Sequence, residues 1–272
     1  MSNERHLKTQ RLSIFPKMSY PQKIFLIILF LAITTGCQSS TLGAEVAMPP
    51  SHQPWTELLS QHVANNGNVN YKGFIKDKAK LDRYLDALSS SPPDKNTWSE
   101  QEQVAYWINA YNAFTVKLIV DNYPVKSIQD LHPTFNIPLV NTVWHKKFFK
   151  IGGEDASLDQ IEHKILRKEF DEPRIHFAIN CASISCPPLR NEAYEAAKLE
   201  QQLDEQGRIF INNTTYNKIR ADRAEISSIF SWFKGDFTSN GSLIDYLNKY
   251  SKTKINPNAK VSHMKYNWDL NE

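Results

Sequence analysis

The feature that most constrains the fold is the run from Gln103 to Val120, QVAYWINAYNAFTVKLIV, which places apolar residues on nearly every side of a helix. Ser99 followed by Glu102 forms a capping box just before this run, and Tyr123-Pro124 ends it. A helix that is apolar all round is stable only when other elements cover all its sides. It is therefore predicted to lie at the centre of the fold. The side chains expected in the core are Trp107, Ile108, Tyr111 and Phe114.

The rest of the chain mixes helical and extended patterns without regular strand–helix–strand units. Apolar spacing and capping signals predict helices over residues 81–88, 157–170, 199–211 and 243–250. Short apolar or alternating runs predict strands over residues 145–151, 174–180, 218–226 and 261–270. Strands scattered among helices favour the α+β class over a doubly wound sheet. We expect a helix-rich single domain with a small antiparallel sheet around the buried central helix.

The N-terminus is typical of a targeting segment. Basic residues precede the unbroken apolar run Ile24–Ile33, which is too short to span a bilayer and suits the core of a signal peptide. The following Thr34-Thr35-Gly36-Cys37 resembles a lipobox, whose cysteine is acylated and becomes the mature N-terminus; Thr34 stands where Leu or Val is usual. We expect a lipoprotein signal peptide at residues 1–36, a flexible tether at 37–54 and one globular domain at 55–272.

The expected location follows from the residues around Cys37. Gln38 is not the Asp that resembles an inner-membrane retention signal, so anchoring by palmitate-type lipid at the outer membrane, facing the periplasm, is favoured. Plain secretory cleavage is the alternative, and Met18 is an alternative start. Removal of residues 1–36 takes the net charge from +3 to close to −1, which leaves no footprint for nucleic acid. The expected partner is the membrane, reached through the lipid.

Four separated motifs, in order along the chain, resemble the domain-of-unknown-function 547 family. They are YWINAYNA (Tyr106–Ala113), LDQIEHKILR (Leu158–Arg167), RIHFAINCASISCPPL (Arg174–Leu189) and YNWDLN (Tyr266–Asn271). The resemblance spans Trp55 to Asn271. It implies a domain that is often exported in bacteria and has no settled activity, so the chemistry must be argued from the residues themselves.

Cys181 and Cys186 are the most informative pair for chemistry. In an oxidising compartment, with the lipobox cysteine acylated, they form an even pair and favour a disulfide across a small loop. A second interpretation makes Cys181 a thiolate nucleophile at the end of a strand, with His163 or His176 as its base. A third interpretation leaves Cys181 as an inert core thiol.

Two further groups of polar residues are candidates for the site. Asn109 and Asn112 share one face of the buried helix, where they either position a substrate or catalytic imidazole, or tie loop backbone to the core. On the 157–170 helix, His163 and Arg167 point away from the apolar stripe that Glu162 borders. They are either a solvated pair or part of a cleft, and in a cleft His163 is the best candidate for a general base.

The sequence predicts neither a metal nor a cofactor. His176, Cys181 and Cys186 are soft ligands, but no CxxC or HExxH spacing supports a zinc site. A Gly-rich phosphate loop and a GxSxG elbow are also absent from the sequence.

Two functional hypotheses remain. The first is a thiol-dependent hydrolase or acyl transferase acting on amide or ester bonds at the cell envelope. It requires backbone N–H donors, expected from the loop CASISCPP at 181–188. The second is a non-catalytic binding or scaffold module for a small molecule, peptide or glycan, stapled by a Cys181–Cys186 disulfide. We expect Cys181, His163, His176, Asn109 and Asn112 to converge around one cleft. The binding-module hypothesis instead requires a Cys181–Cys186 bond with no open groove beside it.

Overall fold

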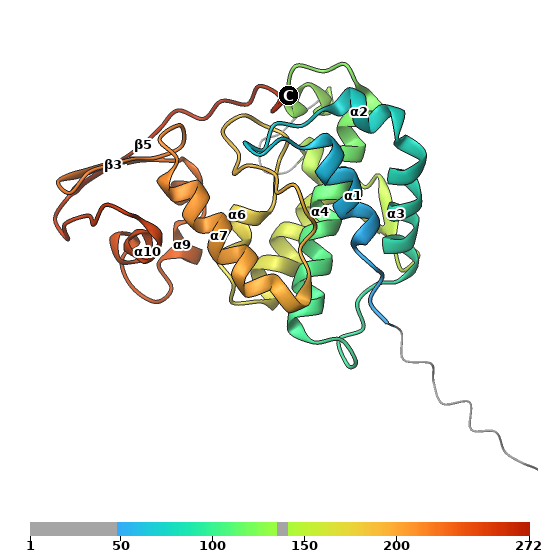
Figure 1. Cartoon of the computed structure of the whole chain (residues 1–272), viewed down its shortest axis with the longest axis horizontal. Coiled ribbons are helices and arrows are strands. Elements are labelled where there is room, and N and C mark those ends of the chain that lie inside the picture. The colour runs from blue at the N-terminus through green and yellow to red at the C-terminus, as the bar shows by residue number, and fades with distance from the viewer. Residues whose placement is uncertain (1–47, 135–140) are drawn as a thin grey trace, which may run out of the picture. The chain divides into compact units, whose positions relative to one another are not determined.

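Helix α4 (Glu100–Asn122) runs through the middle of the domain, as its apolar sequence predicts (Figure 1). The computed structural model describes residues 48–134 and 141–272. The capping box is present, because Ser99 Oγ accepts from the Glu102 N–H and the Glu102 carboxylate accepts from the Ser99 N–H. Ile108, Tyr111 and Phe114 are buried, whereas Trp107 is only partly buried and packs against the core.

Three N-terminal helices cover one side of α4: α1 (Gln53–His62), α2 (Tyr71–Lys76) and α3 (Lys78–Ser90) (Figure 1). Aromatic residues fill the space between them. The ring of Trp55 stacks on Tyr84 with centroids 5.7 Å apart, and Trp55 also contacts Phe74. Trp55 is fully buried, so α1 is part of the core of the domain.

A second group of elements packs against α4 and forms one wall of the cavity described in the next subsection. The 3-10 helices η1 (Ile128–Leu131) and η2 (Val143–His145) lead into a hairpin of β1 (Phe149–Ile151) and β2 (Glu154–Ala156). The predicted helix at 157–170 is present, but its middle is a π-helical segment, η3 (Gln160–Leu166), followed by α5 (Arg167–Glu169). A π-helical turn rotates the side chains that follow it, and such turns are frequent at functional sites.

The C-terminal part has its own aromatic cluster, including Phe177, Phe210, Phe230 and Phe237. Its helices are η4 (Ala196–Lys198), α7 (Leu199–Asn212), α8 (Ile229–Trp232), α9 (Lys234–Phe237) and α10 (Leu243–Tyr250). Its sheet has the order β3 (Lys218–Ile219), β4 (Arg223–Ile226) and β5 (Lys260–His263), with β3–β4 antiparallel and β4–β5 parallel. Both clusters lie within one compact unit, Glu45–Glu272, and the α+β class is confirmed.

Three predicted strands are wrong or too long. Residues 174–180 contain the helical turn α6 (Ile175–Ala178), because all four of its side chains are buried and a turn directs them to different parts of the core. Apolar periodicity cannot distinguish a strand from a buried helical turn over so few residues. The 145–151 strand shortens to β1, and the 261–270 strand shortens to β5, followed by isolated bridges at Asp269 and Leu270.

Asn109 and Asn112 act as internal anchors of α4. The Asn109 side chain donates to the Tyr194 carbonyl at 2.7 Å and accepts from the Tyr194 N–H at 2.9 Å. Asn112 does the same across two residues: it donates to the Ala178 carbonyl at 2.9 Å and accepts from the Asn180 N–H at 2.8 Å. Both amides therefore tie loop backbone to the buried helix. Neither lines the cavity described below, so their expected place in the cleft is wrong.

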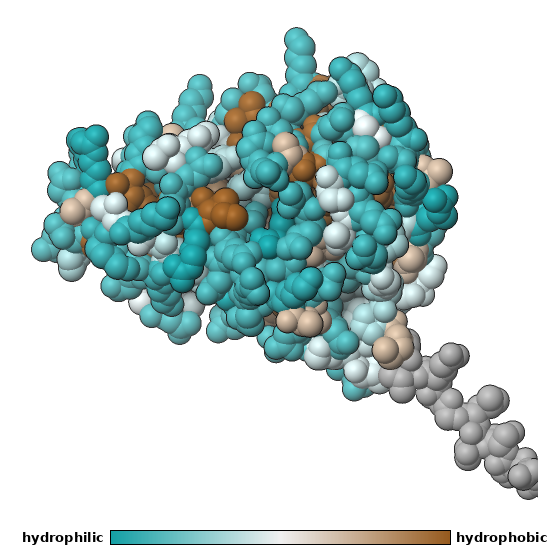
Figure 2. All heavy atoms as spheres, viewed as in Figure 1, coloured by the Kyte–Doolittle hydropathy of each residue, from teal (hydrophilic) through white to brown (hydrophobic). Residues whose placement is uncertain are grey.

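The membrane-related predictions fall largely outside this description. The signal peptide at 1–36, Cys37 and most of the tether at 37–54 lie outside the described residues. Within the described part of the chain, no helix has the combined length and hydropathy needed to cross a bilayer. The visible surface in Figure 2 is mainly hydrophilic, with apolar side chains in small separate groups.

Asn112→Ala should lower the free energy of unfolding by about 2–4 kcal/mol, because it leaves a buried N–H and a buried carbonyl without partners. Urea denaturation measures the change. Asn122→Ala on the same helix is the matched control, since Asn122 is exposed and bonds only the carbonyl of Leu118 one turn away. The control should change stability by less than about 0.5 kcal/mol. Equal effects of the two substitutions would contradict the anchoring role of Asn112.

Candidate functional site

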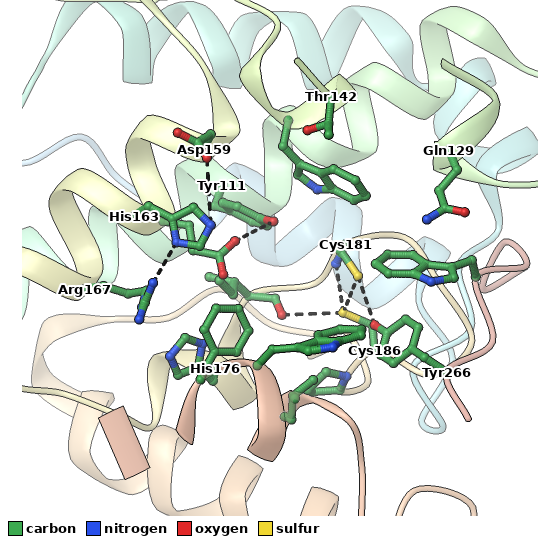
Figure 3. Close-up of a pocket in the computed structure, with 18 of the residues that line it drawn as sticks. Tyr111, Gln129, Thr142, Asp159, His163, Arg167, His176, Cys181, Cys186 and Tyr266 are labelled. Carbon is green, nitrogen blue, oxygen red and sulfur yellow. Dashed lines mark hydrogen bonds and ion pairs between the residues drawn. The ribbon is translucent and has the colours of Figure 1, made fainter. Parts of the chain in front are cut away.

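One cavity of about 960 Å³ lies between α4, η3 and the C-terminal segment (Figure 3). It has the size of a small-molecule site and is lined mainly by apolar side chains. Elements far apart in sequence contribute to it, from Tyr111 on α4 to Trp268 near the C-terminus. Of the residues expected at the site, it brings together Cys181, Cys186, His163 and His176.

Cys181 presents its sulfur to this cavity from the turn after α6. The turn is tight because Ala182 adopts the left-handed conformation, with φ of 59°. Cys186 Sγ lies 3.0 Å from this sulfur and the Tyr266 hydroxyl lies 3.2 Å from it (Figure 3). Ser183 Oγ is a third neighbour, also at 3.2 Å. Hydrogen bonding from Cys186, reinforced by Ser183 and Tyr266, outweighs burial and lowers the pKa of Cys181 to about 7. A large fraction of Cys181 is therefore thiolate at neutral pH.

Cys186 has the opposite character. It is 5% exposed, and burial raises the pKa of its thiol well above the ordinary value. Its sulfur accepts the Cys181 N–H at 2.9 Å while lying beside the Cys181 sulfur. Both cysteines are free thiols in the structure. The disulfide expected from sequence therefore stays a prediction for the oxidised protein.

Most backbone N–H groups of the loop 181–188 are already bonded within the protein, so they are not available as oxyanion donors. The Cys181 N–H is bound to the Cys186 sulfur, and the Ala182 N–H is bound to Asn180 Oδ1. The N–H groups of Ile184 and Ser185 donate to carbonyls of the C-terminal segment, and that of Cys186 donates to Ser183. The hydroxyls of Ser183 and Tyr266 are the donors that face the sulfur instead.

The two candidate bases belong to a separate network at the other end of the cavity. His176 Nε2 bonds Asp236 at 2.7 Å, and Arg167 binds both oxygens of the same carboxylate. His163 Nδ1 lies 3.0 Å from the Arg167 guanidinium. Among the described hydrogen bonds, none joins a histidine to the Cys181 sulfur, so the expected thiol–imidazole pair is not formed in this structure.

The same network is held in a fixed charge state. Burial alone would raise the pKa of Asp236, but the bonds from His176 and Arg167 lower it well below the ordinary value. Burial lowers the pKa of both His163 and His176, so both imidazoles are neutral at pH 7. This part of the cavity wall joins α5, α6 and α9 as a structural unit.

Glu162 is the residue whose importance the sequence does not reveal. It is buried on η3 and lines the cavity, with Tyr111 donating to its Oε2 at 3.2 Å. Burial, with a further contribution from the charge of Cys181, raises the pKa of Glu162 to about 8. The carboxyl is therefore largely protonated at pH 7. The sequence shows that Glu162 borders the apolar stripe of its helix. It does not show that Glu162 is buried, because the burial depends on contacts that only the fold provides.

Aromatic rings form the wall nearest the thiol pair. Trp232 stacks on Trp268 at 5.8 Å with nearly parallel rings, and Tyr266 packs against both rings, at 4.7 and 4.5 Å. Trp144 extends the row to Trp268 at 5.6 Å. Trp232 is 50% exposed despite its size, so this wall has an accessible face. We call these four residues the aromatic wall.

The described residues contain no group of three or more His, Cys, Asp or Glu side chains arranged to hold a metal ion. His176 and the two cysteines line one cavity, but the imidazole is committed to Asp236 and each sulfur to the other. The chemistry of the site must therefore be derived from these side chains themselves.

Residues 95–211 match the model of the family described as "Protein of unknown function, DUF547". The family resemblance is confirmed over a shorter span than the 55–271 expected from sequence. The match includes α4, η3 and the cysteine loop, and excludes the C-terminal part of the aromatic wall. No curated protein and no solved structure matches the chain.

Cys186→Ala should raise the pKa of Cys181 above about 7, because it removes the largest hydrogen-bond contribution to the thiolate. The pH dependence of the iodoacetamide reaction rate, measured in a Cys37→Ser background, reports the midpoint. Cys186→Ser keeps a donor at the position and should shift the midpoint less. An identical midpoint in all three proteins would contradict the assignment of Cys186 as the main stabilising donor.

Proposed function

We propose that this domain is a thiol-dependent enzyme with Cys181 as its nucleophile. The single observation that carries the proposal is the Cys181 sulfur, exposed to a cavity and surrounded by three hydrogen-bonding groups. Hydrogen bonds to the sulfur stabilise the thiolate, and the thiolate, not the thiol, is the nucleophile. A structural cysteine gains nothing from such an arrangement.

The surroundings of the sulfur favour substrates with good leaving groups. Amide cleavage needs a base or acid at the nitrogen and strong donors for the oxyanion. Here a large fraction of Cys181 is thiolate at neutral pH, and two hydroxyls lie within hydrogen-bond distance of its sulfur, but no imidazole is bonded to it. Of the bonds expected from sequence, esters and thioesters therefore fit better than amides, in either hydrolysis or acyl transfer.

Glu162 is the proton donor in this proposal. A protonated carboxyl at the cavity wall can protonate a departing alkoxide or thiolate, and its pKa of about 8 keeps it protonated where Cys181 is ionised. A protonated Glu162 and an ionised Cys181 are thus present together, as a general acid and a nucleophile must be. Tyr111 holds the carboxyl in place from α4.

Labelling of the reduced, desalted full chain carrying Cys37→Ser tests the nucleophile. Iodoacetamide at pH 6 should modify Cys181, and not Cys186, roughly five- to tenfold faster than an ordinary cysteine: the larger thiolate fraction outweighs the lower nucleophilicity of an acidic thiol. Peptide mass mapping identifies the site, and an activated ester such as p-nitrophenyl acetate should acylate the same residue.

The controls for this test are one substitution at the nucleophile and one on the surface. Cys181→Ser should abolish both modifications, whereas Ser239→Ala, an exposed change outside the cavity, should leave them unchanged. Labelling no faster than that of the unfolded chain, or labelling at Cys186 first, would remove the enzyme proposal. The aromatic wall would then favour the second hypothesis, a binding module stapled by the cysteines.

We also propose that the domain is anchored to the outer membrane, facing the periplasm, by lipid on Cys37. The support is the apolar run Ile24–Ile33 followed by Thr-Gly-Cys, a polar segment and then a folded domain whose first described helix is α1.

In a bacterial host, the chain should therefore partition with membranes, and Cys37→Ser should release it or leave it unprocessed. Intact-mass analysis and membrane fractionation measure both outcomes. A mature chain that carries an unmodified Cys37, or that stays soluble, would contradict lipid anchoring.

A further inference from the structure

The enzyme proposal uses one sulfur and leaves the second unexplained. Cys186 is a buried nucleophilic group, held against the reactive one rather than merely near it in sequence. We propose that Cys181 and Cys186 form a dithiol–disulfide couple that exchanges with low-molecular-weight disulfides bound in the cavity. This inference rests on Cys181 being the nucleophile, and it specifies a sulfur electrophile as its substrate.

The loop geometry suits both states of such a couple. The two sulfurs are 3.0 Å apart, about 1 Å longer than the S–S bond of about 2.05 Å. Asn180 Nδ2 donates to the Pro187 carbonyl at 2.8 Å, and the Cys186 N–H donates to the Ser183 carbonyl at 3.1 Å. The ends of the loop are thus tied together independently of the sulfurs. Closing the bond requires a small movement inside an already closed loop.

The different exposure of the two cysteines assigns their roles. Cys181 is half-buried and lines the cavity, so a bound disulfide meets it first. Cys186 lies behind it, 5% exposed, and its sulfur already contacts the Cys181 sulfur. Cys181 is therefore the attacking thiol and Cys186 the resolving thiol. The high pKa of Cys186 keeps it protonated until the first step is complete.

The exchange balances without any further reagent. The Cys181 thiolate attacks one sulfur of R–S–S–R, forming a Cys181–S–S–R bond and releasing R–S⁻. The Cys186 thiol then passes its proton to this departing thiolate, and its sulfur attacks the Cys181 sulfur. The second R–S⁻ leaves and takes up the proton that Cys181 lost on ionisation. Overall, the protein dithiol is oxidised to a disulfide and the substrate disulfide is reduced to two R–SH molecules.

The cavity limits the substrate to small molecules. A thiol recessed in a cavity of about 960 Å³ is reached by a ligand that enters the cavity, and not by a disulfide on the surface of a folded protein. The aromatic wall beside Tyr266, whose hydroxyl contacts the Cys181 sulfur, offers flat apolar faces for the substituent on sulfur. Disulfides with a planar substituent should therefore react preferentially.

The stoichiometry of a neutral aromatic disulfide, 4,4′-dithiodipyridine, tests the couple on the reduced Cys37→Ser full chain. The chain should release two thiopyridine equivalents and lose two hydrogens by intact mass. Adding Cys186→Ser should stop the reaction at one equivalent, with a stable thiopyridyl adduct on Cys181. A stable adduct on Cys181 in the presence of Cys186 would overturn the couple but leave the nucleophile intact. Failure of Cys181 to react with iodoacetamide would instead overturn the underlying enzyme proposal.

The role of the aromatic wall needs a second comparison, because any close pair of thiols can oxidise. The rate at which the chain reacts with each disulfide is first divided by the rate at which N-acetylcysteine reacts with the same disulfide. The normalised rate for 4,4′-dithiodipyridine is then divided by the normalised rate for 2-hydroxyethyl disulfide. The ratio should be at least severalfold above one and should fall toward one in Trp232→Ala. Ile209→Ala removes a similarly exposed apolar side chain outside the cavity and should leave the ratio unchanged. A ratio of one in the starting protein would overturn the substrate assignment.

Discussion

The burial of the middle of α4, from Val104 to Val120, is the constraint on which the rest of the structure depends. A polar side chain buried in this segment is stabilised by a partner inside the protein. Asn112 finds it in the backbone at Ala178 and Asn180, directly before Cys181, while Tyr111 finds it in the Glu162 carboxyl. Adjacent residues of one helix therefore position both the turn that presents the nucleophile and the acid that faces it. The cavity is built outward from this helix.

The features that depend on local sequence were predicted correctly. The capping box at Ser99, the burial of α4 and the helix at 157–170 follow from spacing and composition, and each is present. The 174–180 strand was wrong because its environment, not its pattern, decides the conformation of so short a segment. The π-helical geometry of η3 likewise has no recognisable signal in the sequence.

The sequence predicted which residues lie at the candidate site better than it predicted their roles. Four expected residues line the cavity, but His176 bonds Asp236, which is 60 residues away, and His163 bonds Arg167, which is four residues away. Tyr266, 85 residues beyond Cys181, is the donor that the sequence could not assign. The protonation of Glu162 also depends on burial by distant segments. Long-range contacts decide the role of each group, and a single sequence does not contain them.

The central claim is that the fold itself supplies a thiolate at neutral pH, through a thiol and two hydroxyls in place of an imidazole. Ultraviolet thiolate absorbance, followed during a pH titration of the reduced Cys37→Ser chain, measures this directly. The account predicts one thiolate with a midpoint of about 7, absent in Cys181→Ser, and a second ionisation only at much higher pH. Two thiols that both titrate at the ordinary cysteine value of about 8.5 would contradict it.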